Sequence, residues 1–212
     1  MDELDILKRD WKKQEANLPK ISYDDIYKMI HKKSSSIVKW ILIISIAELL
    51  FWTGLNLLIP DSYLEIYEKF NLKTFLLASQ FIHYIIVIVF IYFFYKNYKA
   101  ICVSENTNLL MKKIIKTRKT VNYYVYYNII VYVLLSIILN IVMFSNPETL
   151  IEALNPGNLN IDGDKFLNIM LIVQVVTLIV MLGLLCLYYR IIYGILLRRL
   201  SKNYKELASL EH

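Results

Sequence analysis

Four long apolar runs limit the folds that are open to this chain of 212 residues. They cover residues 37–59, 75–95, 121–144 and 166–189. A helix of about 20 residues crosses the roughly 30 Å hydrocarbon core of a bilayer, and each run reaches that length. The chain is 57% hydrophobic with a mean hydropathy of +0.46, and the excess lies in these runs. The sequence therefore predicts an all-α membrane protein with four spans.

Lysine and arginine are distributed unevenly around the four runs. Nine lie in residues 1–39, seven in 96–120 and five in 190–212, whereas 60–74 holds two and 145–165 holds one. Because basic loops remain on the cytoplasmic side, this pattern places both termini in the cytoplasm. Aromatic residues at the basic ends of the runs are expected at the membrane interface: Trp40, Tyr95, Tyr98, Tyr123, Tyr124, Tyr188 and Tyr189.

The predicted organisation is one membrane bundle with smaller flanking parts. Residues 1–36 form cytoplasmic amphipathic helices, 37–197 the four-span bundle and 198–209 a cytoplasmic helical tail. Residues 210–212 look like the start of an expression tag and are excluded from functional reasoning. The first run follows a long charged segment, unlike a cleavable signal peptide, so we expect it to remain as an anchor. The predicted fold is a four-helix transmembrane bundle with short amphipathic helices on its surfaces.

The N-terminal segment has an amphipathic pattern with two interpretations. Leu4, Leu7 and Trp11 share one helical face, and acidic residues precede basic ones as the helix dipole favours. Ser22 and Asp25 then form a capping box for a second helix that continues into the first span. The first helix either lies on the membrane surface or docks a cytoplasmic partner through those three anchors.

Each span also carries polar residues within its apolar run. Glu48 is the most costly of them, because a carboxylate in hydrocarbon needs a partner. Counting the helical rise from the edges of each run places these groups near the middle of the bilayer. The predicted intramembrane polar layer consists of Glu48, His83, Tyr132, Gln174, Gln80 and Ser136.

Three roles for this layer stay open, and we favour them in the order given. Glu48, neutral or paired with His83, hydrogen-bonds across the bundle and sets which helices meet. Alternatively, Glu48 and His83 form the proton, cation or solute site of a small transport bundle. The third is a membrane-embedded enzyme, but the sequence has no HExxH, no GxSxG and no Cys/His cluster. We therefore expect no catalytic residue, no metal and no cofactor.

The expected partners follow from the charge and the apolar runs. The net charge of +6 suits basic flanks that bind anionic lipid of the inner leaflet, beside the bilayer itself. A cytoplasmic protein is a further expected partner, and the sequence leaves a homo-oligomer open. Nucleic acid is not expected, because no soluble module combines a basic groove with aromatic residues.

The segments LKRDWKKQ, IHKKSSSIVKW and NTNLLMKKIIKTRKTVNYY resemble a group of small multi-span membrane proteins from flavobacteria. Members of that group are often labelled beta-carotene 15,15'-monooxygenase-like, a label that implies iron held by several histidines. Similar small proteins with an LKxxWxxQ-type start are suspected membrane partners of extracytoplasmic-function sigma factors. From the residues we expect a non-enzymatic interaction or regulatory protein of the bacterial inner membrane, whose N-terminal helix and 96–120 loop face a cytoplasmic partner. The second resemblance implies that this role is anti-sigma-like at most.

Overall fold

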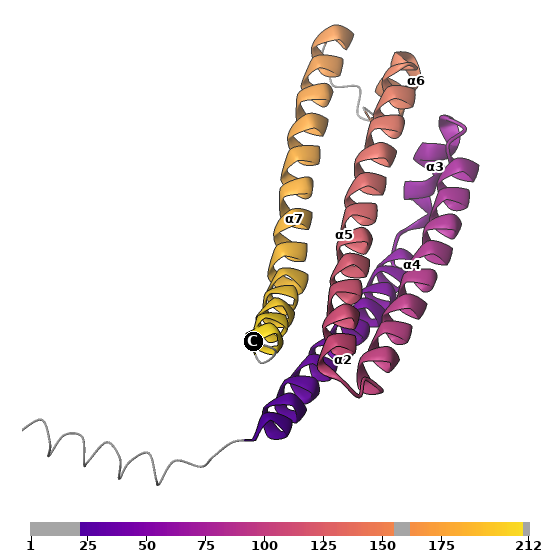
Figure 1. Ribbon diagram of the computed structural model, residues 1–212. Coiled ribbons are helices and arrows are strands. Elements are labelled where there is room, and N and C mark those ends of the chain that lie inside the picture. The colour runs from indigo at the N-terminus through magenta and orange to yellow at the C-terminus, as the bar shows by residue number, and fades with distance from the viewer. Residues whose placement is uncertain (1–21, 155–161, 210–212) are drawn as a thin grey trace, which may run out of the picture.

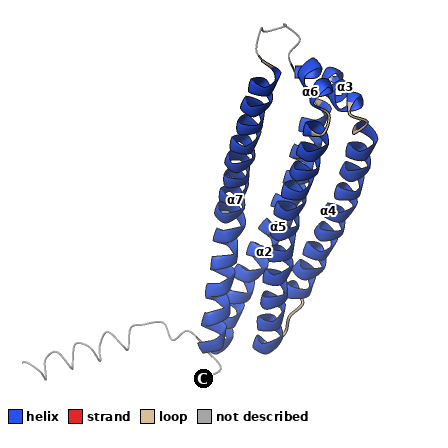
Figure 2. Ribbon diagram, turned by 90° about the horizontal axis from the view of Figure 1, so that it is seen from above, coloured by secondary structure: helices blue, strands red, loops and turns tan. Residues whose placement is uncertain are grey.

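The computed structural model describes residues 22–154 and 162–209, of which 92% are helical and none lies in a strand (Figure 2). Four of the described helices are long and apolar enough to cross a membrane: α2 (Tyr23–Leu57), α4 (Lys73–Cys102), α5 (Thr107–Phe144) and α7 (Gly163–Ser209). Two short helices, α3 (Asp61–Lys69) and α6 (Pro147–Leu154), lie between α2 and α4 and between α5 and α7. The predicted all-α fold with four long apolar helices is confirmed. The predicted N-terminal helix and its anchors Leu4, Leu7 and Trp11 lie outside the described residues.

The four long helices form a bundle, and going around it the neighbours follow the order α2, α4, α5, α7. α2 and α5 each pack against both α4 and α7, and they also touch across the bundle, whereas α4 and α7 do not meet. The start of α2, the turn from α4 to α5 and the end of α7 lie at one end, and α3 and α6 lie at the other (Figure 1). Since most lysines and arginines flank the first of these, we name it the basic end. α2 is tilted relative to the other helices (Figure 1).

Local signals in the sequence fix where the helices begin. The Ser22 hydroxyl oxygen accepts from the Asp25 backbone N–H at 3.2 Å and donates to the Asp25 carboxylate at 2.8 Å, which confirms the predicted cap of α2. Asn106 caps α5 by accepting from the Leu109 N–H at 2.8 Å. Asn71, in the turn before α4, has a φ of 56°, a left-handed conformation that asparagine tolerates better than most residues. These caps set the ends of long helices that continue past the apolar runs.

The buried core lies toward the basic end and not along the whole length of the apolar runs. Fully buried side chains come from all four long helices: Val38, Ile41, Phe94, Ile101, Leu110, Ile114, Val121, Tyr124, Tyr193, Leu200 and Leu207. By contrast, no residue of the most apolar window of α7 is buried in the protein. Exposed apolar side chains are expected there, because lipid tails surround them as favourably as protein does.

Beyond the apolar runs the helices continue as a structure that we name the stalk. It comprises residues 23–36 of α2, 96–102 of α4, 107–120 of α5 and 190–209 of α7. Its helices are joined by side-chain hydrogen bonds in addition to apolar packing. The Asn203 amide donates to the Ser34 hydroxyl at 3.0 Å, and the Asn97 amide donates to the Thr120 hydroxyl at 3.1 Å.

A second, smaller apolar cluster closes the opposite end. Phe70, Leu72, Met143 and Leu150 are buried there and bring α3 and α6 together. Lys69 and Glu152 add an ion pair of 3.2 Å, but both side chains are exposed, so it contributes at most about 1 kcal/mol. The two short helices therefore cover the bundle by apolar packing.

Candidate functional site

Glu48 lies on the inner face of α2 and is only 6% exposed. Its carboxyl group accepts hydrogen bonds from the hydroxyls of three tyrosines. We name these three residues and Glu48 the tyrosine cluster. The hydroxyl of Tyr124 donates to Oε2 at 2.9 Å, that of Tyr193 to Oε2 at 3.0 Å and that of Tyr189 to Oε1 at 2.9 Å. Both carboxyl oxygens are thus occupied, and one side chain links α2 to α5 and α7.

The tyrosine rings are held in place by edge-on aromatic contacts. The Tyr124 ring meets Phe94 at a centroid distance of 5.5 Å and an angle of 79°, and Phe90 at 5.4 Å and 69°. It also meets Tyr189 at 6.3 Å and 83°. Such edge-to-face pairs are favourable, and here they aim the hydroxyls at one point. Tyr189 and Tyr193 are one helical turn apart, so α7 presents both hydroxyls on the same face.

This arrangement satisfies a buried carboxyl group with hydroxyl donors. A buried acid without partners is strongly unfavourable, and hydrogen bonds to both oxygens offset that cost. No basic side chain takes part in these contacts within the described residues. No group of three or more His, Cys, Asp or Glu side chains suited to a metal ion occurs in the described part of the chain. The contacts that the structure shows in the cluster are hydrogen bonds between helices.

His83 does not pair with Glu48, so that part of the predicted interaction is wrong. Its Nδ1 lies 3.3 Å from the Tyr127 hydroxyl, and the two rings stack at a centroid distance of 5.7 Å with an angle of 11°. His83 is half-buried and joins α4 to α5, whereas Glu48 joins α2 to α5 and α7. The Glu48 carboxyl group binds tyrosine hydroxyls of α5 and α7, and the His83 imidazole is not among its partners.

The other predicted polar residues do not join Glu48. Gln80 donates to the Tyr84 hydroxyl at 3.1 Å, and Asn56 donates to the same hydroxyl at 3.3 Å. The backbone carbonyl of Ser136 accepts from the Asn140 amide at 2.8 Å. Tyr132 and Gln174 are half-buried and make no side-chain hydrogen bond with the described residues. The structure therefore divides the predicted layer into separate contacts.

Glu48 also lies nearer the basic end than the predicted position in the middle of the bilayer. Its partners Tyr124 and Tyr193 stand close to residues 121 and 189, the predicted basic edges of the third and fourth spans. The predicted depth holds only if all four helices stand upright and their apolar runs begin at the same level. α2 is instead tilted relative to the other helices (Figure 1). The tyrosine cluster therefore sits where the spans pass into the stalk.

The three tyrosines that bind Glu48 were not among the residues predicted for the polar layer. Tyr124 and Tyr189 were predicted to lie at the membrane interface, yet both are buried, while the neighbouring Tyr123 is exposed. A usable signal was present, because Tyr189 and Tyr193 are four residues apart on one helix. Two hydroxyls at that spacing form a paired donor face toward an acid on an adjacent helix.

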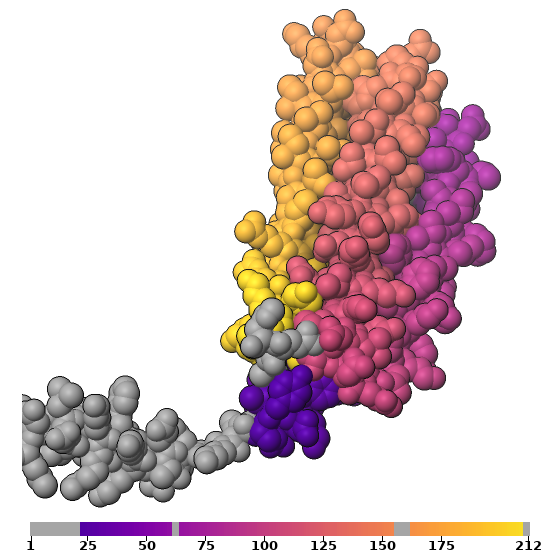
Figure 3. All heavy atoms as spheres, in the orientation of Figure 1, coloured from indigo at the N-terminus to yellow at the C-terminus, as the bar shows by residue number. Residues whose placement is uncertain are grey.

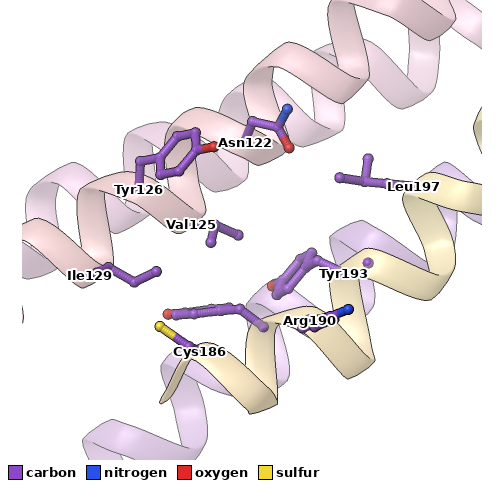
Figure 4. Close-up of a pocket in the computed structure, with 10 residues that line it drawn as sticks. Asn122, Val125, Tyr126, Ile129, Cys186, Arg190, Tyr193 and Leu197 are labelled. Atoms are coloured by element: carbon purple, nitrogen blue, oxygen red, sulfur yellow. The ribbon is translucent and has the colours of Figure 1, made fainter. Parts of the chain in front are cut away.

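A groove of about 220 Å³ lies between α5 and α7 beside the tyrosine cluster. It is lined by Asn122, Val125, Tyr126, Ile129, Cys186, Tyr189, Arg190, Tyr193, Gly194 and Leu197. The lining residues of the two helices face each other across the groove (Figure 4). Tyr189 and Tyr193 thus form one wall of the groove while their hydroxyls bind Glu48.

Four long apolar helices around a buried, tyrosine-bound acid define a multi-span α-helical membrane protein. Residues 24–212 match the model of a family described as a domain of unknown function, DUF8845, and the chain belongs to that family. No curated protein and no solved structure matches the chain.

Proposed function

We propose that this protein is a non-enzymatic interaction module of the bacterial inner membrane, with both termini in the cytoplasm and a regulatory role. The stalk is the observation that carries this proposal. All four long helices continue beyond their apolar runs and pack there into one core, which includes Leu110, Leu200 and Leu207. A bundle that served only to anchor the chain would not need a folded extension outside the apolar spans.

Contacts between α2 and the α4–α5 turn support a stalk of fixed shape. His31 Nε2 lies 2.8 Å from the carbonyl oxygen of Ile101, and the Tyr27 hydroxyl donates to the carbonyl of Ser104 at 2.9 Å. The hydroxyls of Tyr23 and Thr107 lie 2.8 Å apart. These bonds hold the start of α2 against the turn. A rigid surface favours recognition because little conformational entropy is lost on binding.

The outward face of the stalk has the composition of a docking surface. On α5, Leu110 and Ile114 point into the core, while Leu109 and Ile115 are exposed. Exposed lysines accompany them: Lys112, Lys116 and Lys119. Apolar contacts surrounded by positive charge suit a protein surface that carries acidic residues around an apolar patch. The amphipathic segment with Leu4, Leu7 and Trp11 precedes the stalk in the sequence, and in this proposal it takes part in docking.

The proposed orientation predicts which side of the membrane each loop reaches. Cys102 ends α4 at the basic end and is exposed, so a membrane-impermeant maleimide should label it in inverted vesicles and not in spheroplasts. A cysteine introduced as Glu152→Cys, in a chain with Cys102→Ser and Cys186→Ser, should give the opposite result. Labelling of both positions from the same side would contradict the topology.

The docking proposal predicts that the partner protein binds mainly through three N-terminal side chains. Replacing Leu4, Leu7 and Trp11 with alanine should reduce recovery of the bound protein at least about tenfold, because anchor residues contribute more than 1 kcal/mol each. Quantitative mass spectrometry of the complex purified from cross-linked native membranes would measure this. Membrane insertion should be unchanged.

A matched control replaces Asp5 and Arg9 with alanine, which helical spacing puts on the opposite face of the helix that the sequence predicts there. This change removes one acid and one base, so the net charge and the topology signal stay constant. The control should retain the partner. Equal recovery from the triple variant and the parent would remove the docking proposal while leaving the fold unaffected.

A further inference from the structure

The groove between α5 and α7 lies at the level where the fourth span ends. Arg190 is the first basic residue after the apolar run 166–189, and it lines the groove together with apolar and hydroxyl-bearing side chains. Val125, Ile129 and Leu197 supply apolar surface, while Tyr126 and Asn122 supply polar groups. α5 and α7 lie side by side on the face of the molecule seen in Figure 3. A single groove thus combines a cation with surface suited to hydrocarbon.

A second guanidinium lies on the same face of α5. Arg118 precedes Asn122, a lining residue of the groove, by one helical turn, so it lies on the same face of α5 at the stalk end of the groove. Its Nε is buried and has no hydrogen-bond partner among the described residues. A buried donor left unpaired is unfavourable, which indicates that an acceptor belongs nearby.

The described acids do not neutralise these two arginines. The ion pairs within the described residues involve Lys69, Lys73 and Lys202, and none includes Arg118 or Arg190. Glu48 is close in the fold, but its oxygens are occupied by the tyrosine hydroxyls. Positive charge at the edge of the hydrocarbon therefore remains available to an anion.

We propose that this groove binds one anionic phospholipid, with its phosphate near Arg190 and Arg118 and an acyl chain along Val125 and Ile129. Basic pockets between membrane helices on the cytoplasmic side are a recognised setting for anionic lipid headgroups. A free phosphate would make no use of the apolar wall, whereas a neutral lipid would leave the guanidiniums without an anion. The groove binds the lipid independently of any protein docked on the stalk.

Gly194 provides a direct way to fill the groove. A Cβ atom added there would meet only Arg190 Cγ, at 3.9 Å, which is ordinary van der Waals contact. Glycine also weakens a helix interior relative to other residues, so Gly194→Leu should fold at least as well as the parent. The leucine side chain would occupy the part of the groove beside Arg190, which the lipid headgroup needs. Gly183→Leu is the matched control, because a Cβ there meets nothing within 4 Å and Gly183 does not line the groove.

The test is native mass spectrometry of the full chain in detergent, titrated with palmitoyl-oleoyl phosphatidylglycerol or with phosphatidylcholine of the same chains. The parent should bind one phosphatidylglycerol at least tenfold more tightly than phosphatidylcholine. Arg190→Gln and Gly194→Leu should each weaken phosphatidylglycerol binding about tenfold. Arg199→Gln, on the opposite face of α7, and Gly183→Leu should change it less than twofold.

A second measurement separates lost binding from lost folding. Phosphatidylglycerol should raise the melting temperature of the parent and both controls, but not that of Arg190→Gln or Gly194→Leu, whose lipid-free melting temperatures should be no lower than that of the parent. Equal affinity for both lipids, or unchanged binding in Gly194→Leu, would overturn the proposal. Competition by glycerol phosphate as strong as that by the whole lipid would also overturn it, because the site would then recognise a free phosphate.

Discussion

Replacing Glu48 with alanine is expected to destabilise the protein by about 3–4 kcal/mol, because three tyrosine hydroxyls lose their acceptor in a buried site. For a chain of this size that corresponds to a melting temperature lower by roughly 10 °C. Thermal unfolding of purified protein in one detergent, followed by circular dichroism, would measure the change. Glu48→Gln keeps the shape and one acceptor oxygen, so its loss should be smaller.

Single hydroxyl deletions test whether the cluster acts as a unit. Tyr124→Phe, Tyr189→Phe and Tyr193→Phe each remove one hydrogen bond and should cost about 1–2 kcal/mol. The same substitutions in the Glu48→Ala background should have much smaller effects, since the shared partner is already gone. Tyr123→Phe is the matched control, because Tyr123 is exposed and adjacent to Tyr124. If all four phenylalanine variants melt alike, the cluster does not stabilise the fold.

The same variants separate the structural role of Glu48 from transport. Proteoliposomes of the parent should show no proton flux above that of empty vesicles, and Glu48→Gln should leave that result unchanged. A flux that Glu48→Gln abolishes without loss of stability would assign the carboxyl group to a transport path.

Replacing Leu200 or Leu207 with alanine is expected to destabilise the protein by about 2–5 kcal/mol each, because both side chains are 0% exposed. They lie on the part of α7 that continues past its apolar run, so the loss would show that the stalk is a packed core. Thermal unfolding in detergent and resistance of the basic end to limited proteolysis would report it.

The same helix supplies the control for this prediction. Leu184 and Leu187 are 55% and 52% exposed in the apolar half of α7. Their replacement by alanine removes equal volume from a surface that contacts lipid, so each should change stability by less than about 0.5 kcal/mol in detergent. Equal losses at both ends of α7 would place the stabilising core along the whole helix and contradict the structure.

Much of the fold could be predicted because its signals are local. Apolar runs long enough to span a bilayer specified the four long helices, and Ser22 with Asp25 marked the start of α2. The helical continuation of the fourth span was also readable, because apolar residues recur at helical spacing as far as Leu207.

The site could not be predicted as fully, because it depends on how helices are shifted and tilted against one another. Glu48 was recognised as an acid that needs partners, but its partner set includes Tyr124 and Tyr193, far away in the sequence. Depth counted along each helix cannot reveal that α2 crosses its neighbours obliquely. The pairing of His83 with Tyr127 has the same origin, since ring stacking between α4 and α5 depends on their relative rotation.

The apolar half of α7 has a mechanical consequence. Since no residue of its most apolar window is buried in the protein, little buried packing there resists a change in its inclination. A mismatch between its apolar length and the thickness of a surrounding bilayer would then change that inclination at modest cost. Tyr189 and Tyr193 lie where this apolar half meets the stalk. A change in its inclination would therefore first alter the hydrogen bonds that their hydroxyls donate to Glu48.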